Sequence, residues 1–133
     1  MPLNKKTFII MVASAILIVL ISVILVKYSN TPSKYDGFAS CLSEKGAKFY
    51  GAFWCPHCQE QKKIFEKSAK KLPYIECSTA DGQGQTQTCK DMDIKGYPTW
   101  ILTNGERLTP GTNGFSIEKS LEILSEKTQC PLV

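Results

Sequence analysis

Residues 48–65, KFYGAFWCPHCQEQKKIF, decide the fold. They contain two of the six cysteines, Cys55 and Cys58, which are separated by Pro56 and by His57, the only histidine of the chain. The apolar and aromatic run KFYGAFW is typical of a buried strand, and Pro56 falls at the first turn of the helical pattern that follows. The sequence therefore places both cysteines where a strand passes into a helix, which is where open α/β sheets carry their reactive groups.

The segments around this stretch predict alternating helices and strands. We expect helices over residues 36–45, 55–72 and 86–92, and a last helix that Ser116 caps. We expect strands over residues 48–54, 74–78, 99–103 and 106–109, with a hairpin turn at Asn104-Gly105. This order predicts an α/β fold in which a mixed sheet of about four strands is flanked by helices on both faces.

The N-terminal segment differs sharply in composition from the rest of the chain. Residues 7–26, TFIIMVASAILIVLISVILV, carry no charge, and twenty helical residues span about 30 Å, the thickness of a bilayer's hydrocarbon core. A buried helix of a soluble protein would show a polar face, and a cleaved signal peptide has a shorter apolar region of about 7–15 residues. We expect a cytoplasmic tail over 1–6, a transmembrane anchor over 7–26, a linker over 27–33 and a folded domain over 34–133.

Flanking charges and cysteine content indicate the compartment of the domain. Lys5, Lys6 and the terminal amine precede the span, whereas Lys27 and Lys34 follow it, and this small bias favours a cytoplasmic N-terminus. Six cysteines in so small a domain fit an oxidising compartment, where thiols persist as disulfides. We expect a single-pass membrane protein whose domain is extracytoplasmic, in the periplasm or at the cell exterior.

The charge composition argues against a nucleic-acid partner. The net charge is +4, but Arg107 is the only arginine, and surfaces that read phosphates and bases rely on arginine forks. A lysine cluster falls at helical spacing and is interpreted as the solvated face of one helix: Lys62, Lys63, Lys67, Lys70 and Lys71.

The spacing of the cysteine pair suits thiol–disulfide exchange. Cys55 is expected at a helix N-terminus, where unpaired backbone N–H groups and the helix dipole favour a thiolate. His57 can add a hydrogen bond or a positive charge, and stabilising the reduced form makes the disulfide a stronger oxidant. Cys58, one turn further on, is expected to be more buried and to act as the resolving thiol, while Pro56 keeps the first turn rigid.

Two other interpretations of the pair remain open from the residues alone. Cys55 and Cys58 could join Cys77 and Cys89 in a four-cysteine zinc site, although zinc modules usually bring a second closely spaced pair. A purely structural disulfide is the other alternative, but such a short loop is strained and suits exchange better than crosslinking. We therefore expect no metal and no cofactor.

The strings FYGAFWCPHC and GYPTW resemble the thioredoxin superfamily over about residues 38–127. The resemblance implies a thioredoxin-like fold, with Pro98 as the cis-proline that lies opposite the cysteine pair in that family. It also implies that the Tyr97–Pro98 loop pairs with the substrate backbone. Trp54 would line the same contact surface, with core packing as its alternative. Many thioredoxins carry a buried acid below the active site, whereas residues 49–53 contain none, so proton handling is expected to differ.

A narrower resemblance rests on YGAFWCPHCQEQKKIF, YIEC and IKGYPTW. These strings look like the thioredoxin-like C-terminal domain of bacterial vitamin K epoxide reductase homologues, in which a final transmembrane helix leads into this domain. The quinone-reducing four-helix portion of those proteins is missing from this sequence. The resemblance therefore implies a separate quinone-linked membrane partner of the vitamin K epoxide reductase type.

The other four cysteines are expected to form structural disulfides. In the resembled domain Cys77 and Cys89 look like a matching pair, and their bridge would pin the intervening loop; a relay pair that passes electrons to Cys55–Cys58 is the alternative. Cys41 and Cys130 pair by elimination. Their helices place them near opposite ends of the domain, however, which challenges the roughly 7 Å limit between bridged Cα atoms, and Cys41 could instead be a buried thiol.

Together these features predict a membrane-anchored, extracytoplasmic thiol–disulfide oxidoreductase. In this hypothesis Cys55–Cys58 exchanges disulfides with protein substrates and is reoxidised by the quinone-linked partner. One alternative is a disulfide reductase or isomerase fed by a membrane electron donor. Another is a non-catalytic binding module whose cysteine pair is structural or zinc-bound.

Overall fold

The computed structural model describes residues 4–111 and 116–132, and the chain divides into two compact units, Met1–Pro32 and Ser33–Val133. The first unit contains α1, Lys5–Asn30, whose N-cap Asn4 accepts a hydrogen bond from the Lys6 N–H. Every residue of α1 is exposed. By length and composition α1 is able to cross a membrane, and an N-terminal signal sequence has the same properties.

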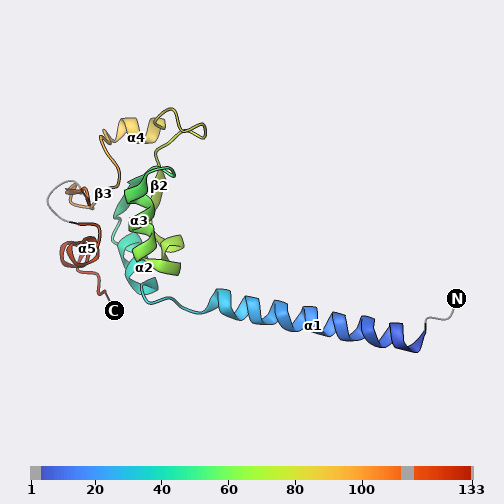
Figure 1. Ribbon diagram of the computed structural model, residues 1–133. Coiled ribbons are helices and arrows are strands. Elements are labelled where there is room, and N and C mark those ends of the chain that lie inside the picture. Colours follow the sequence, from blue (N-terminus) through green and yellow to red (C-terminus); the bar gives the residue numbers. More distant parts are fainter. Residues whose placement is uncertain (1–3, 112–115, 133) are drawn as a thin grey trace. The chain divides into compact units, whose positions relative to one another are not determined.

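The second unit is built on one four-stranded sheet. Its elements follow in this order (Figure 1): α2 Asp36–Glu44, β1 Lys48–Gly51, α3 Pro56–Ile64, the 3₁₀ helix η1 Glu66–Lys71, β2 Tyr74–Glu76, α4 Gln87–Asp91, β3 Thr99–Ile101, β4 Arg107–Leu108 and α5 Ser120–Thr128. The strand order is β2-β1-β3-β4, with β1 parallel to β2, β1 antiparallel to β3, and β3 antiparallel to β4. The predicted mixed α/β sheet is confirmed.

The two faces of the sheet pack into separate apolar clusters, because successive strand residues point to opposite faces. On one face Phe49 stacks on its cross-strand partner Trp100, with ring centroids 4.8 Å apart, and residues of α2 and α5 complete this cluster. On the other face Tyr50 and Ile101 pack with Cys89 of α4. Helices therefore cover both faces and hold β1 rigidly at the centre.

The single helix predicted over residues 55–72 is wrong. The α-helix ends at Ile64, Glu66 takes a left-handed φ of 53°, and a 3₁₀ helix follows. Phe65 is fully buried at this break and stacks on Phe38, with ring centroids 5.7 Å apart. The packing of Phe65 in the core thus overrides the helical propensity of the lysine-rich segment.

The last helix begins later than predicted. It starts at Ser120 rather than next to Ser116, although the Ser116 hydroxyl still accepts a hydrogen bond from the Lys119 N–H at 3.4 Å. The buried Ser120 hydroxyl accepts a hydrogen bond from the buried Gln61 amide at 2.8 Å, which ties α5 to α3. Leu121 and Leu124 of this helix are buried.

Two disulfides crosslink the domain. Cys77–Cys89 has its Cα atoms 5.5 Å apart, and Cys41–Cys130 has them 5.8 Å apart. The distance objection to the second bridge was wrong because the chain reverses after α5. Gln129 adopts a left-handed φ of 58°, and the Ser125 hydroxyl donates to the Cys130 carbonyl.

Candidate functional site

The two remaining cysteines lie at the carboxyl end of β1. Cys55 is the N-cap of α3, and Pro56 occupies the first helical position, where its missing N–H removes no hydrogen bond. Both thiols are free and buried, with Cys55 6% and Cys58 1% exposed. The strand-to-helix junction therefore presents a dithiol, with Cys55 nearer the surface.

The Tyr97–Pro98 loop lies against Cys55. The Cys55 thiol donates to the Tyr97 carbonyl at 3.7 Å, and the Tyr97–Pro98 peptide bond is cis. This contact brings together residues that are 42 positions apart in sequence. The Tyr97 carbonyl thus lies beside the more exposed of the two sulfurs.

Aromatic side chains surround the mouth of the site. The Trp54 ring is 49% exposed, so its alternative as a core residue is wrong, and it meets the Tyr97 ring edge-on with centroids 6.0 Å apart. The Trp54 indole N–H donates to the Ser78 hydroxyl at 2.9 Å, which fixes the ring. Phe53 is 50% exposed beside it. Sequence analysis missed Phe53, because its place in an apolar run indicated a core strand.

His57 lies on the outer side of the first turn of α3. Its side chain is half exposed, and its Nδ1 atom lies 3.7 Å from Glu60 Oε2. A Cβ atom on Gly111 would lie 3.7 Å from the same nitrogen. The imidazole therefore faces Glu60 and the Gly111 turn.

The Cys58 side chain points toward Gly51, the last residue of β1, and toward Tyr74 of β2. The position that a Cβ atom on Gly51 would take lies 2.9 Å from Cys58 Sγ, 2.8 Å from Tyr74 Cε2 and 3.4 Å from the Tyr74 hydroxyl. Glycine is thus required for this close approach. Burial raises the pKa of Cys58 to about 12, and its contact with Cys55 adds to the rise, whereas a hydrogen bond from the Ala52 backbone and, to a smaller extent, the Lys62 charge oppose it.

A charged cluster adjoins Cys58 that sequence analysis did not identify. The Tyr74 hydroxyl donates to Glu76 Oε2 at 2.8 Å, and Lys62 Nζ lies 3.2 Å from the centroid of the Tyr74 ring. Lys62 is therefore not a freely solvated lysine of the predicted charged face. Lys62 follows Cys58 by one helical turn, but Glu76 reaches the cluster only through the parallel register that pairs it with Gly51, which the sequence does not show.

The two disulfide-bonded cysteines near the site are inaccessible. Cys77 and Cys89 are both 0% exposed, and exchange requires access to a sulfur, so this geometry favours a structural role over an electron relay. Their bond also removes them as zinc ligands for Cys55 and Cys58. Within residues 4–111 and 116–132, no group of three or more His, Cys, Asp or Glu side chains is placed to hold a metal.

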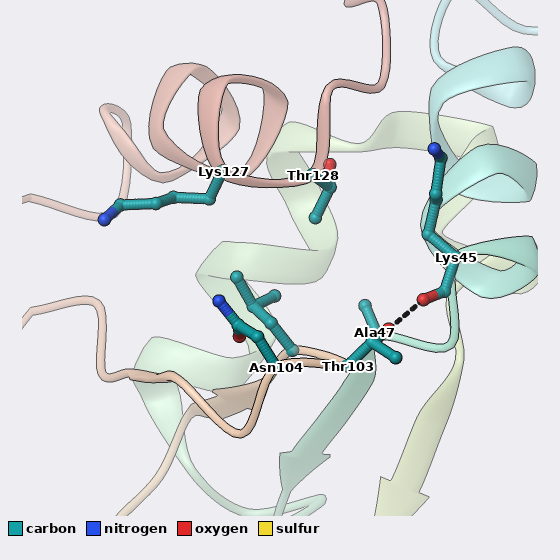
Figure 2. Close-up of a pocket in the computed structure, with 7 residues that line it drawn as sticks. Lys45, Ala47, Thr103, Asn104, Lys127 and Thr128 are labelled. Atoms are coloured by element: carbon teal, nitrogen blue, oxygen red, sulfur yellow. Dashed lines mark hydrogen bonds between the residues drawn. The ribbon is translucent and has the colours of Figure 1, made fainter.

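A pocket of about 180 Å³ lies at the opposite end of the sheet from the cysteines. It is lined by Lys45, Ala47, Leu102, Thr103, Asn104, Lys127 and Thr128. Figure 2 shows the Thr103 hydroxyl bonded to the Lys45 carbonyl across it. Ala47 precedes β1, whereas Cys55 follows it, and Lys127 is already paired with Glu106 at 2.8 Å. The pocket is therefore separate from the dithiol site.

Comparisons with known proteins agree with this site. The chain is 43% identical over 81 residues to the thiol-disulfide oxidoreductase LTO1 of Arabidopsis thaliana, covering 57% of this chain and 22% of that protein. It is 32% identical over 107 residues to protein disulfide-isomerase A4 of Mus musculus, covering 71% and 17%, and 34% identical over 106 residues to the thioredoxin domain-containing protein 5 homolog of Drosophila melanogaster, covering 70% and 25%.

This chain spans a quarter or less of the length of these three relatives. Two of their names describe thiol–disulfide chemistry, which supports thiol–disulfide oxidoreductase activity for a domain with a free cysteine pair at this position. The family described as Thioredoxin matches residues 24–125, and the chain therefore belongs to the thioredoxin family.

Proposed function

We propose that this protein is a membrane-anchored thiol–disulfide oxidoreductase, in which Cys55–Cys58 exchanges disulfides with protein substrates on the extracytoplasmic side. The observation that carries the proposal is the free dithiol at the N-terminus of α3, with the Tyr97 carbonyl 3.7 Å from Cys55 Sγ. A cysteine pair that only crosslinks the fold needs neither free thiols nor a backbone hydrogen-bond acceptor next to one of them. The two other disulfides of the domain fit an oxidising compartment.

The oxidising reaction proceeds in two exchange steps. A substrate thiolate attacks Cys55 Sγ of the disulfide form, the Cys55–Cys58 bond breaks, and Cys58 leaves with the electron pair and then takes up a proton. A second substrate thiolate attacks the substrate sulfur of the mixed disulfide, and Cys55 leaves as a thiolate. The substrate dithiol is thereby oxidised to a disulfide, and the enzyme pair is reduced by two electrons.

The groups around Cys55 provide the contact surface for the substrate. The Tyr97–Pro98 loop would pair with extended substrate backbone, since the Tyr97 carbonyl is an acceptor at the mouth of the site. The half-exposed ring of Trp54 offers apolar area to a substrate side chain. Pro56 and His57 flank Cys55 on the helix side, where His57 can add positive charge.

The reduced pair must be reoxidised after each turnover. We propose a quinone-linked membrane partner of the vitamin K epoxide reductase type, supported by the resemblance of residues 50–65, 74–77 and 94–100 to the domain fused to such proteins. The 26-residue apolar helix α1 would hold the domain beside a partner in the membrane. Lys5 and Lys6 at its start favour a cytoplasmic N-terminus.

A reductase or isomerase is the second candidate, and the relatives named protein disulfide-isomerase favour it. It uses the same two steps in reverse. The Cys55 thiolate attacks a substrate disulfide, and the Cys58 thiolate then attacks Cys55 to release the substrate thiol. The pair then needs a membrane electron donor rather than an acceptor.

Trapping a mixed disulfide tests the shared chemistry of both directions. The full chain carrying Cys58→Ala is incubated with two peptides that are joined by a disulfide. One of the two peptides should stay covalently bound to Cys55, because the resolving thiol is missing. The matched variant Cys55→Ala should retain none, since the buried Cys58 is not the attacking sulfur. If neither variant retains peptide, the exchange proposal fails and a structural cysteine pair takes its place.

A further inference from the structure

We propose that Lys62 is a positioning residue for exchange, whose ammonium group, held over the Tyr74 ring beside Glu76, stabilises Cys58 while its sulfur carries negative charge. This inference rests on the proposed function but not on its direction. When the disulfide is attacked, Cys58 leaves as a thiolate; when the mixed disulfide is resolved, Cys58 attacks as a thiolate. The same buried sulfur bears the charge in both steps.

Burial makes that charge costly. Cys58 is 1% exposed, so water cannot solvate its thiolate, and burial is the main cause that raises its pKa to about 12. A buried anion forms readily only where a nearby cation or hydrogen-bond donors replace water. A hydrogen bond from the Ala52 backbone already favours the Cys58 anion, and among the titratable groups around it, Cys55, Lys62, Tyr74 and Glu76, only Lys62 is a cation.

The helix and the strand together place Lys62 next to this sulfur. Lys62 follows Cys58 by four residues on α3, so both side chains lie on the same face of the helix. Lys62 Nζ lies 3.2 Å from the Tyr74 ring centroid, and the same ring approaches Cys58 at the bare Cα of Gly51. The aromatic ring thus contacts the ammonium group and lies near the sulfur, and its face attracts the cation.

Glu76 holds this arrangement in place. One carboxylate oxygen accepts from the Tyr74 hydroxyl at 2.8 Å, and the other accepts from the backbone N–H groups of Ser78 at 2.8 Å and Phe53 at 3.2 Å. Burial lowers the pKa of Lys62, whereas the charges of Glu76 and Cys58 raise it. Glu76 therefore fixes the ring and favours the charged form of Lys62.

The competing interpretation is that Lys62 only covers the Tyr74 ring with its aliphatic stem. Lys62→Met distinguishes the role of the charge from that of the stem, because methionine keeps an apolar side chain over the ring and removes the charge. Lys63→Met is the matched control, since Lys63 is the next residue of α3, is exposed, and loses the same charge. Lys62→Arg restores the cation.

The test follows the two steps by which the full chain in detergent, with Cys55–Cys58 reduced, reacts with oxidised glutathione. The first step forms the Cys55–glutathione disulfide, and the second is attack by Cys58, which releases glutathione. We expect Lys62→Met to slow the second step about threefold, because fewer Cys58 thiols ionise without the nearby cation, while the greater nucleophilicity of the more basic thiolate recovers part of the rate. Its pH profile should move to higher pH, while the first step stays close to wild type.

The controls make each outcome decisive. Lys63→Met should resolve at the wild-type rate, and Lys62→Arg should recover most of the lost rate. Equal second-step rates and pH profiles for Lys62→Met and Lys63→Met would overturn the role of Lys62, as would failure of Lys62→Arg to restore the rate. Failure of the proposed function looks different, because the wild-type chain would then not form the mixed disulfide in the first step.

Discussion

Gly51 shows how one missing side chain builds the reactive site. It ends β1, pairs with Glu76 of β2, and lets Cys58 Sγ and the Tyr74 ring approach its Cα. Any other residue would place a Cβ atom within 2.9 Å of the sulfur and 2.8 Å of the ring. Close packing of Cys58 therefore depends on a glycine that carries no chemistry of its own.

Gly51→Ala should destabilise the domain by about 1–3 kcal/mol, the usual result of overpacking a core. It should also disturb exchange, because both Cys58 and Tyr74 must move. Gly37→Ala is the control: it lies in α2 with nothing within 4 Å of the added Cβ, so it should stabilise by about 0.5–1 kcal/mol. Urea unfolding of the unit Ser33–Val133 measures both, and equal effects of the two variants would refute the packing argument.

The Cys58 thiol should make the stability of the domain fall in alkaline solution. Burial raises its pKa from 9.0 to about 12, so above pH 9.0 the unfolded chain ionises this thiol while the folded chain keeps the proton. The stability that Cys58 contributes is complete below the unfolded value and is lost as pH rises toward about 12. Cys55→Ser should therefore lose stability relative to Cys55→Ser/Cys58→Ser across this window. A constant difference between the two variants would contradict the shift.

At the scale of elements, an ion pair joins the start of α2 to the end of η1. Asp36 Oδ2 lies 2.9 Å from Lys71 Nζ. The hydrogen bond from Lys71 is the largest cause that lowers the pKa of Asp36 from 3.8 to about 2, with a smaller contribution from Ser68. Two lysines of the lysine-rich segment therefore make specific contacts: Lys62 contacts the Tyr74 ring beside Cys58, and Lys71 pairs with Asp36 at the start of α2.

Asp36→Asn should flatten the acid limb of the stability curve. Because the folded pKa is depressed, the carboxylate stabilises the domain above pH 3.8, and this contribution is lost as pH falls toward about 2. The free energies of unfolding of the wild type and of Asp36→Asn, followed by tryptophan fluorescence from neutral to acidic pH, should therefore converge at the acid end. Parallel curves would show that the ion pair is not linked to folding.

The elements also show where local patterns fail. Short apolar runs and turn residues predicted every strand of the sheet and its hairpin, since these signals are local. The break after Ile64 was not predictable from the same signals: nothing in EKSAKK opposes a helix, and only the burial of Phe65 against Phe38 explains it. Tertiary packing decided that boundary.

At the scale of the whole domain, the two disulfides close loops of very different length. Cys41 and Cys130 are 89 positions apart, whereas Cys77 and Cys89 are 12 apart. In the loop-entropy model the longer loop gives about 4–5 kcal/mol and the shorter about 3 kcal/mol. The Cys41–Cys130 bridge therefore contributes most to holding the chain's end on the core.

Cys41→Ala/Cys130→Ala should lower the free energy of unfolding more than Cys77→Ala/Cys89→Ala does. Both double variants keep the Cys55–Cys58 pair, so urea unfolding with that pair oxidised compares the loops directly. The reverse order of stabilities would show that loop length does not govern these crosslinks.

The candidate site was predictable only in its linear part. CPHC, the strand before it and the Tyr97–Pro98 loop could be recognised from sequence, because each is a short motif. Lys62, Tyr74 and Glu76 could not, since a lysine in a charged run and a glutamate in a strand are ordinary residues until the parallel register of β1 and β2 brings them to Cys58. The return of Cys130 to Cys41 likewise depends on one left-handed residue, Gln129.

The most direct test of the central claim is the reduction potential of Cys55–Cys58, measured by equilibrating the full chain with glutathione. Cys77→Ser/Cys89→Ser, measured alongside, isolates the pair. We predict a value near the strongly oxidising end of the family, about −120 mV, which is what the oxidising direction of the proposed function requires. A value near that of thioredoxin, about −270 mV, would contradict the oxidising direction, and a pair that does not cycle would contradict catalysis altogether.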